Sequence, residues 1–209
     1  LLGRVIEIVS GKSLDIFLKD EIFEPLGMED TAFNISPVSL DRFSSLYSPV
    51  EGNSLELIDH RDNSPYQKPV LFSGGGGLVG TIDDYMKFGE MICAGGICKN
   101  YRILSKKTLE FMRLNHLRGD IASLGPESFA EQPMDGMGFG LGGAVVMNPG
   151  LTRIPGSVGD FGWGGMASTF FWTDPVHNMS VVFFTQLSPS SSYSNRAELK
   201  ALVHSAITD

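Results

Sequence analysis

Residues 157–187 contain several glycines around a tryptophan. Of all the segments in the sequence, this one has the residue types most typical of a reactive site. Gly162, Gly164 and Gly165 surround Trp163 at a point where the chain should be entering a strand. Glycine at such a place marks a bulge or a close approach of the backbone to something else, and a substrate is one such neighbour. The alternative is that the glycines only let two backbones pack, and the pattern alone does not decide between the two.

A second glycine-rich run, residues 70–81, imitates a nucleotide site. Gly75, Gly77 and Gly80 satisfy the spacing G-x-G-x-x-G, but the helix expected next begins only after the last glycine. The dinucleotide fingerprint needs that helix to open within the motif, and it needs an acidic strand end about 20 residues later. The sequence has neither feature, which argues against a dinucleotide site.

The cysteines and histidines lack the spacing of a metal site. Cys93 and Cys98 flank a glycine pair, and the 4 histidines are scattered singly along the chain. A structural zinc site requires four ligands at suitable spacing, so we expect no metal. No motif in the sequence indicates another cofactor. The cysteines are predicted to be buried or free thiols, with a local disulfide as the alternative.

Composition narrows the class of partner. The 209 residues carry a formal net charge of -8 with only 16 Lys and Arg, which argues against a nucleic-acid or anionic-membrane surface. No apolar run reaches the roughly 18 residues of a membrane span. We therefore expect small or neutral partners. The chain is also long enough to form one sizeable hydrophobic core.

The glycine and tryptophan cluster must be positioned by strands. Residues 167–173 and 179–187 are rich in Val, Phe, Trp and Thr, and residues 174–178 between them make a loop of hairpin length with a proline. Residues 138–147 are predicted as a further strand. The closing helix is predicted to begin at Asn195 as its N-cap, and its apolar stripe can lie on the sheet. The stripe consists of Leu199, Leu202, Val203, Ala206 and Ile207.

Helices are predicted before the strands. Residues 1–10 have helical spacing and end at Gly11, a second helix runs from Ser13 to about residue 26, and others start at Thr81 and Ser105. Residues 34–68 are predicted to be a long surface excursion with at most short pieces of structure. Because the first helix lacks an N-cap, we expect the natural chain to continue upstream.

The order of elements gives an α+β layout in a single unit, residues 1–209. Residues 1–137 are the mainly helical part, and residues 138–209 supply the sheet strands and the closing helix.

Several runs in this order resemble the C-terminal portion of the serine β-lactamase-like hydrolases. These include class C β-lactamases, related esterases and acyltransferases, and D-amino-acid peptidases. The runs are LLGRVIEIVSGKSL, IFEPLGMEDTAF, GGGGLVGTIDDYMKF, GFGLGG and VGDFGWGG. The resemblance covers nearly the whole chain and implies a β-lactamase/transpeptidase-like fold, of which this chain would be part.

The resemblance also implies site residues. In that family a Ser-x-x-Lys helix gives the nucleophile, a Tyr motif assists proton transfer, and a Lys-Thr-Gly or equivalent triad lines the opposite wall. Trp163, Gly164 and Gly165 match the triad and would bind substrate, and the backbone N–H of Met166 would be one oxyanion donor. The second donor would belong to the nucleophilic Ser.

The nucleophile is absent from these 209 residues, because no Ser in the sequence begins Ser-x-x-Lys. Tyr193 begins a Tyr-x-Asn, but it follows the triad, whereas the family's Tyr should lie upstream of Leu1. The motif G-x-S-x-G is missing as well, which argues against an α/β-hydrolase. Trp163 in place of a cation offers an apolar wall, and this favours neutral acyl esters over β-lactams.

We therefore expect the C-terminal half of a serine hydrolase that forms an acyl-enzyme, with a small-molecule ester or amide as substrate. The alternative is a non-catalytic binding or interaction module. The resemblance further implies a five-stranded sheet to which an upstream segment adds two strands, leaving the strand at residues 179–187 bare. We expect that edge to pair with a second copy of the chain or with a separate N-terminal fragment.

Overall fold

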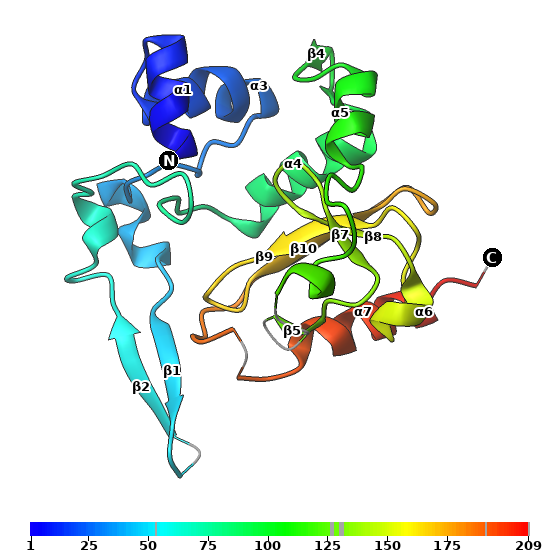
Figure 1. The fold of residues 1–209 in the computed structure, drawn as a ribbon. Helices are drawn as coiled ribbons and strands as arrows, with labels where there is room; N and C mark the ends of the chain where they lie inside the picture. The colour runs from blue at the N-terminus through cyan, green and yellow to red at the C-terminus, as the bar shows by residue number, and fades with distance from the viewer. Residues whose placement is uncertain (53, 126–127, 130–131, 191, 209) are drawn as a thin grey trace.

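The computed structural model describes residues 1–52, 54–125, 128–129, 132–190 and 192–208 of the chain. Its central feature is a 5-stranded antiparallel sheet with the strand order β11-β10-β9-β8-β7 (Figure 1). The strands are β7 (Met137–Phe139), β8 (Ala144–Val146), β9 (Phe161–Gly164), β10 (Phe170–Asp174) and β11 (Met179–Phe183). Each strand pairs with its neighbour in sequence, so the sheet is a meander.

Smaller paired strands lie outside this sheet. β1 (Leu46–Val50) and β2 (Ser54–Asp59) form a long hairpin that projects from the rest of the molecule (Figure 1). The short pairs are β3 (Ile97–Cys98) with β4 (Tyr101–Arg102), and β5 (Ser128–Phe129) with β6 (Gln132–Pro133). The hairpin lies inside residues 34–68, where the sequence predicted at most short pieces of structure.

Helices precede and close the sheet. They are α1 (Leu2–Ser10), α2 (Leu14–Leu18), α3 (Glu24–Leu26), α4 (Ile82–Cys93), α5 (Lys106–Met112), α6 (Pro149–Thr152) and α7 (Asn195–Ser205). A π-helical turn, Lys19–Phe23, joins α2 to α3, and 3-10 turns occupy Pro37–Arg42, Pro65–Gln67 and Ala122–Leu124. This order, in which most helices precede the sheet strands and one helix closes the chain, confirms the predicted α+β class.

The predicted ends of several helices are confirmed by their caps. Gly11 takes the left-handed conformation with φ 70°, and its N–H donates to the carbonyl of Glu7. The Thr81 side chain accepts from the N–H of Asp84, and the Ser105 side chain accepts from the N–H of Thr108. These local signals could be read from the sequence because each cap involves residues only three or four positions apart.

The sheet lies between two helices. α4 packs on β10 and β11, where Phe171 makes edge contacts with Tyr85 and Phe88 at ring distances of 5.1 and 6.2 Å. Burial raises the pKa of Tyr85 to about 12, so this phenol stays neutral within the core. α7 covers the opposite face, which places the C-terminal helix and α4 on the two sides of the sheet (Figure 1).

The prediction of one strand over residues 138–147 is wrong, because this segment folds back on itself. Met137, Gly138 and Phe139 of β7 pair with Val146, Val145 and Ala144 of β8. Gly142 makes the turn with φ 102°, a conformation that residues with a Cβ rarely adopt. The glycines that suggested a strand with small residues at its start are therefore the turn of a hairpin.

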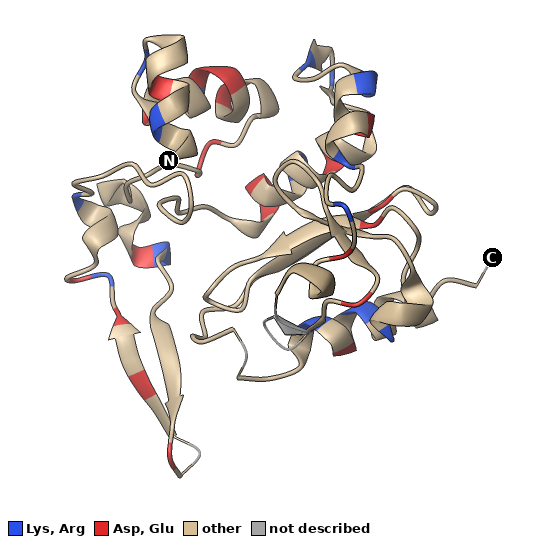
Figure 2. Ribbon diagram, viewed as in Figure 1, with Lys and Arg blue, Asp and Glu red and all other residues tan. Residues whose placement is uncertain are grey.

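The prediction for the sheet-facing side of α7 is also wrong. Leu202 of the apolar stripe is 68% exposed, and the buried residues of the helix are Arg196 and Lys200. Arg196 lies over the ring of Phe170 at 5.7 Å, and Lys200 lies over the ring of Trp172 at 5.9 Å. Both distances are within the range of a favourable cation–π contact. Figure 2 shows positively charged residues in blue along the ribbon of α7. The helix also begins one position earlier than predicted, with Ser194 as its N-cap.

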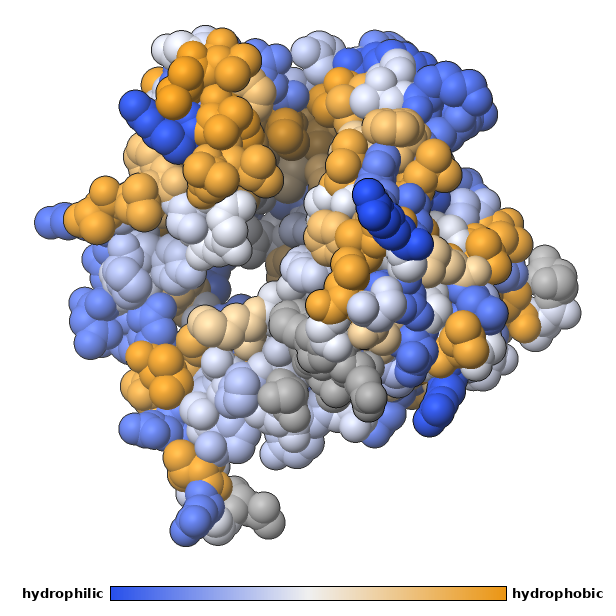
Figure 3. All heavy atoms as spheres, in the orientation of Figure 1, coloured by the Kyte–Doolittle hydropathy of each residue, from blue (hydrophilic) through white to orange (hydrophobic). Residues whose placement is uncertain are grey.

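The other end of the molecule carries uncovered apolar surface. α1 has no buried residue, and Leu2, Ile8 and Val9 are 76%, 68% and 82% exposed. Figure 3 shows this hydrophobic surface over α1. Within the described part of the chain, no helix combines the length and apolar character needed to cross a membrane.

The two cysteines are free, as the sequence predicted. The Cys93 thiol donates to the carbonyl of Met179 at 3.3 Å, which ties α4 to the start of β11. Burial raises the pKa of Cys93, so the thiol form is favoured over the reactive thiolate.

Candidate functional site

Trp163 lies on β9, a central strand of the sheet. It pairs with Phe171 of β10, and its ring meets that of Phe139 edge-on at 5.2 Å. The residue remains 40% exposed, which is high for a tryptophan in a central strand. It therefore presents a partly open aromatic surface, held in place by Phe139.

A tight turn follows β9 and carries Met166. The N–H of Ser168 donates to the carbonyl of Gly165 at 3.2 Å, and the N–H of Gly165 donates to the carbonyl of Thr169 at 2.9 Å. Residues 165–168 thus form a β-turn with Met166 in its second position. The turn closes without using the N–H of that second position, and among the residues that the structure describes no acceptor pairs with the Met166 amide. The prediction that residues 167–173 are strand fails at its start, because the strand begins only at Phe170.

Packing accounts for each glycine around Trp163. A Cβ on Gly164 would lie 2.7 Å from Cζ of Arg196, and a Cβ on Gly162 would lie 2.2 Å from the carbonyl oxygen of Phe171. On Gly165 it would lie 2.3 Å from Oγ1 of Thr169. The alternative reading of these glycines, close packing of the chain on itself, is therefore sufficient for their presence. Their contact with substrate stays a prediction.

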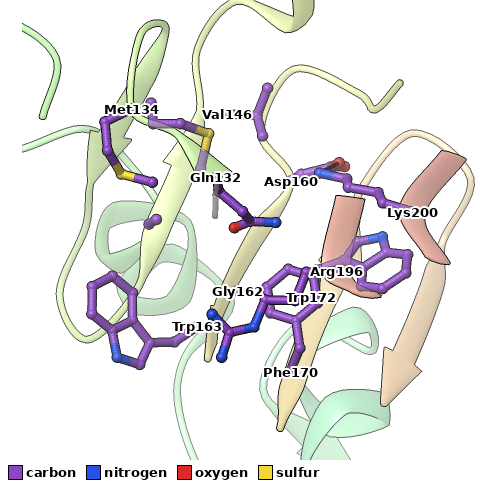
Figure 4. Close-up of a pocket in the computed structure, with 12 residues that line it drawn as sticks. Gln132, Met134, Val146, Asp160, Gly162, Trp163, Phe170, Trp172, Arg196 and Lys200 are labelled. Carbon is purple, nitrogen blue, oxygen red and sulfur yellow. Dashed lines mark ion pairs between the residues drawn. The ribbon is translucent and has the colours of Figure 1, made fainter. Parts of the chain in front are cut away.

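A small cavity lies beside β9 on the side of α7. Its volume is about 50 Å³, and Gly162, Phe170, Trp172, Arg196 and Lys200 are among the residues that line it (Figure 4). Pockets for organic ligands are typically several hundred Å³. The cavity has room for a few water molecules at most, so the described residues do not by themselves enclose a substrate.

Polar groups cluster at the far end of β10, around Asp174. This carboxylate is fully buried and accepts from Oγ of Ser157 at 2.7 Å and from Nδ1 of His177 at 2.8 Å. The backbone N–H groups of Val176 and His177 donate to its other oxygen. Burial raises the pKa of Asp174, but these hydrogen bonds outweigh burial and lower it to about 2.

The same cluster contains metal-ligand atoms. Three residues each contribute one such atom, and these atoms lie within 4.8 Å of one another: Asp160, Asp174 and His204. The ammonium of Lys200 already lies 2.7 Å from Oδ2 of Asp160 (Figure 4). A cation supplied by the protein thus already compensates the charge of Asp160. Burial raises the pKa of Asp160, against the lowering effect of Lys200. We interpret the cluster as a structural network that fastens α7 to the sheet.

The structure brings the predicted site residues together on one strand and its turn. Trp163 and Gly164 end β9, and Gly165 and Met166 begin the turn. Sequence reasoning missed Arg196, whose guanidinium reaches the same turn from α7. A buried arginine must have partners, so its burial would have indicated a structural role. The sequence shows the charge of this residue but not its burial.

Comparison with known proteins identifies the family. The model of the Beta-lactamase family matches residues 1–205. An uncharacterized protein of Mycobacterium tuberculosis is 29% identical over 196 residues, which are 92% of this chain and 48% of that protein. An Escherichia coli protein, provisionally named a D-alanyl-D-alanine carboxypeptidase, is 23% identical over 88% of this chain and 42% of its own. The chain thus spans about half the length of the curated relatives it matches.

Solved structures show the same relation. EstCE1, described as a hydrolase with promiscuous acyltransferase activity, is 26% identical with a TM-score of 0.77 over 97% of this chain and 53% of its own. Simvastatin synthase (LovD) from Aspergillus terreus is 21% identical with a TM-score of 0.76 over 97% of this chain and 50% of its own. A penicillin binding protein from Bacillus halodurans is 20% identical with a TM-score of 0.66 over 96% and 53%.

The predicted resemblance and fold are confirmed by these matches, which align this chain with about half of each solved structure. This chain belongs to the Beta-lactamase family.

Proposed function

We propose that this chain is the C-terminal half of a serine hydrolase that works through an acyl-enzyme. The observation that carries the proposal is the turn after β9, which leaves the Met166 N–H outside the hydrogen bonds that close it. An oxyanion hole needs a backbone donor held rigidly at the edge of a substrate site. Met166 is 70% exposed, and the neighbouring Trp163 is partly open, so both border accessible space.

The wall formed by residues 163–166 favours neutral acyl esters. By the resemblance, Trp163 stands where a Lys-Thr-Gly triad has its cation, and its ring offers a substrate carboxylate no ionic partner. An ester with a short apolar acyl group would instead bury surface against the indole. EstCE1, a hydrolase with promiscuous acyltransferase activity, is 26% identical to this chain and supports an esterase or transesterase.

The rest of the machinery would come from the segment that precedes this region in the longer relatives. A Ser-x-x-Lys there would supply the nucleophile and its activating amine, and a Tyr motif would assist proton transfer. The Ser Oγ would attack the ester carbonyl, the alcohol would leave, and water or a second alcohol would release the acyl group. In this scheme the Met166 N–H holds the oxyanion of each tetrahedral intermediate.

The alternative is a binding or interaction module without catalysis. Two observations favour it: the 209 residues contain no Ser-x-x-Lys, and the cavity beside β9 is only about 50 Å³. The reading frame around this chain separates the alternatives. A Ser-x-x-Lys followed by a Tyr motif shortly before Leu1 is expected for the enzyme, and a long reading frame without them would exclude it.

The activity test uses the longer protein from that reading frame. We expect a burst of p-nitrophenol from p-nitrophenyl butyrate that is stoichiometric with protein, and slower turnover of a chromogenic cephalosporin. Replacing the Ser of Ser-x-x-Lys by Ala is the matched control and should abolish the burst. A longer protein with both motifs but no burst, or with faster cephalosporin turnover, would contradict the proposal.

A further inference from the structure

Arg196 connects α7 to the turn that carries Met166. The residue is 3% exposed, and Nη2 of its guanidinium donates to the carbonyl of Gly165 at 2.8 Å and to the carbonyl of Thr169 at 3.2 Å. A charged donor makes a stronger hydrogen bond than a neutral one. The Gly165 carbonyl therefore has two donors, Arg196 and the N–H of Ser168.

The surroundings are shaped to receive this guanidinium. It lies over the ring of Phe170 at 5.7 Å, and Gly164 has no side chain at the point where a Cβ would fall 2.8 Å from Nη2. A planar guanidinium can stack on a ring and donate along its edge at the same time, which an ammonium cannot do. Burying a charge is costly unless such partners are present, so this arrangement fixes the geometry of the turn.

The geometry of the peptide bond transmits that constraint to Met166. The carbonyl of Gly165 and the N–H of Met166 belong to one planar unit, in which a trans peptide points the two groups in opposite directions. Holding the carbonyl on the side of α7 therefore aims the N–H away from α7. A cation at the oxygen also polarises the amide and strengthens the N–H as a donor.

We propose that Arg196 is the positioning residue for the oxyanion donor at Met166. This inference rests on the proposed function, because it gives the Met166 N–H its catalytic meaning. Arg196 contacts no reacting atom; it acts through the Gly165–Met166 peptide.

Lys200 provides a matched control one helical turn away. It is also a buried cation on the same face of α7, at 7% exposure, and it lies over Trp172. Its ammonium binds Asp160 and not the turn. Arg196→Met and Lys200→Met each remove one buried charge from α7, but only the first releases the Gly165 carbonyl.

The first experiment uses the 209-residue chain and needs no activity. Two-dimensional ¹H–¹⁵N NMR compares the amide signals of Met166 and Ser168 in the wild type and in both variants. In Arg196→Met we expect the Met166 amide proton to move upfield, because its peptide has lost the polarising cation. The Ser168 amide proton should move downfield, because the Gly165 carbonyl to which it donates has lost a competing donor. In Lys200→Met both should stay near their wild-type positions. An unmoved Met166 signal in a folded Arg196→Met protein would overturn the inference.

The second experiment uses the longer protein with p-nitrophenyl butyrate. We expect Arg196→Met to lower kcat about 10- to 100-fold with little change in KM, somewhat less than the loss of a whole oxyanion donor. The inhibition constant for a phenylboronic acid, whose adduct mimics the oxyanion, should rise by a similar factor. Lys200→Met should leave kcat near wild type and lower only the unfolding midpoint.

Equal losses of kcat in the two variants, or no loss in Arg196→Met, would overturn the positioning role. A wild-type longer protein without an ester burst would instead defeat the proposed function, and the NMR comparison would still decide whether Arg196 holds the peptide. The two failures are therefore distinguishable.

Discussion

Trp163 is the residue on which the proposed substrate class depends. Replacing it by Lys restores a cation at the triad position, and we expect the ratio of ester to cephalosporin turnover in the longer protein to fall about tenfold. Trp163→Phe keeps an apolar ring and should keep the ratio. Steady-state kinetics with both substrates measures it. A ratio that Trp163→Lys leaves unchanged would mean that this residue does not set the substrate class.

Asp174 is expected to make stability depend on acid. Its folded pKa of about 2 lies below the ordinary 3.8, so the folded state binds this proton less tightly than the unfolded state. The carboxylate's contribution of about 2 kcal/mol should be complete above pH 4 and should disappear as the pH falls through 2. Asp174→Asn should remove this contribution, because an asparagine has no charge. Its amide presents Ser157 and His177 with either an uncharged oxygen or an NH₂ group that cannot accept their hydrogen bonds.

Urea unfolding at several pH values tests this expectation. The free energy of unfolding of Asp174→Asn should fall below wild type at pH 7, and the difference should shrink toward pH 2. Asp135→Asn, at an exposed position, is the control and should have little effect at any pH. A difference that is the same at pH 7 and pH 2 would show that the charge of Asp174 is not responsible.

At this scale the sequence predicted part of the candidate site. Trp163, Gly164, Gly165 and Met166 are contiguous, so one motif was enough to place them on a strand and its turn. Arg196 is about thirty residues away and reaches the turn only after α7 has packed on the sheet. A contact of that kind depends on tertiary packing, and no local pattern encodes it.

Among the elements, β9 and β10 leave no room for a side chain at Gly162. A Cβ there would lie 2.2 Å from the carbonyl oxygen of Phe171 and 2.9 Å from Cα of Trp172. Both atoms are backbone and cannot turn aside, so Gly162→Ala should destabilise the protein by about 3 kcal/mol. Chemical denaturation measures this, with Gly76→Ala as control because nothing lies within 4 Å of that Cβ. Equal unfolding midpoints for the two variants would mean that the sheet relaxes around the added methyl.

The elements that the sequence predicted well are those with local signals. α1 and α4 were found from their periodicity and caps, and the β10–β11 hairpin from its composition and loop length. The face of α7 was predicted wrongly because hydrophobicity favours Leu202, whereas the sheet offers aromatic rings and buried carboxylates that select cations. The β1–β2 hairpin was missed because β2 is mostly exposed and β1 contains Pro49, a residue that strand patterns disfavour.

For the molecule as a whole, the absence of Ser-x-x-Lys from these 209 residues has a direct consequence. The chain alone should not hydrolyse p-nitrophenyl acetate or a chromogenic cephalosporin above background, because an oxyanion donor without a nucleophile cannot form an acyl-enzyme. Stopped-flow absorbance with purified chain measures this, and buffer without protein gives the background rate. A burst stoichiometric with protein would show that the chain has a nucleophile of its own.

The sheet edge at β11 leads to a prediction about assembly. The resemblance implied a sheet completed by upstream strands, but this chain supplies five strands itself, with β11 outermost on one side. Among the residues that the structure describes, β11 pairs with β10 alone along its length. Val181, Val182 and Phe183 make this strand apolar, and an unpaired apolar edge recruits other strands. We therefore expect the chain to pair through β11 with a second copy or with an N-terminal fragment.

Light scattering at tens of micromolar should report a dimer or larger species for the purified chain. Val181→Lys places a charge on the edge strand and should shift the population toward monomer, as charged residues do on natural edge strands. Val176→Lys adds the same charge in the turn beside β11, at a residue that is 67% exposed, and should leave the assembly unchanged. Uncovered apolar surface on α1 gives a second route to association, so equal effects of the two variants would place the interface there and not on β11. A monodisperse monomer whose β11 amides resist hydrogen exchange would mean that the chain covers this edge itself.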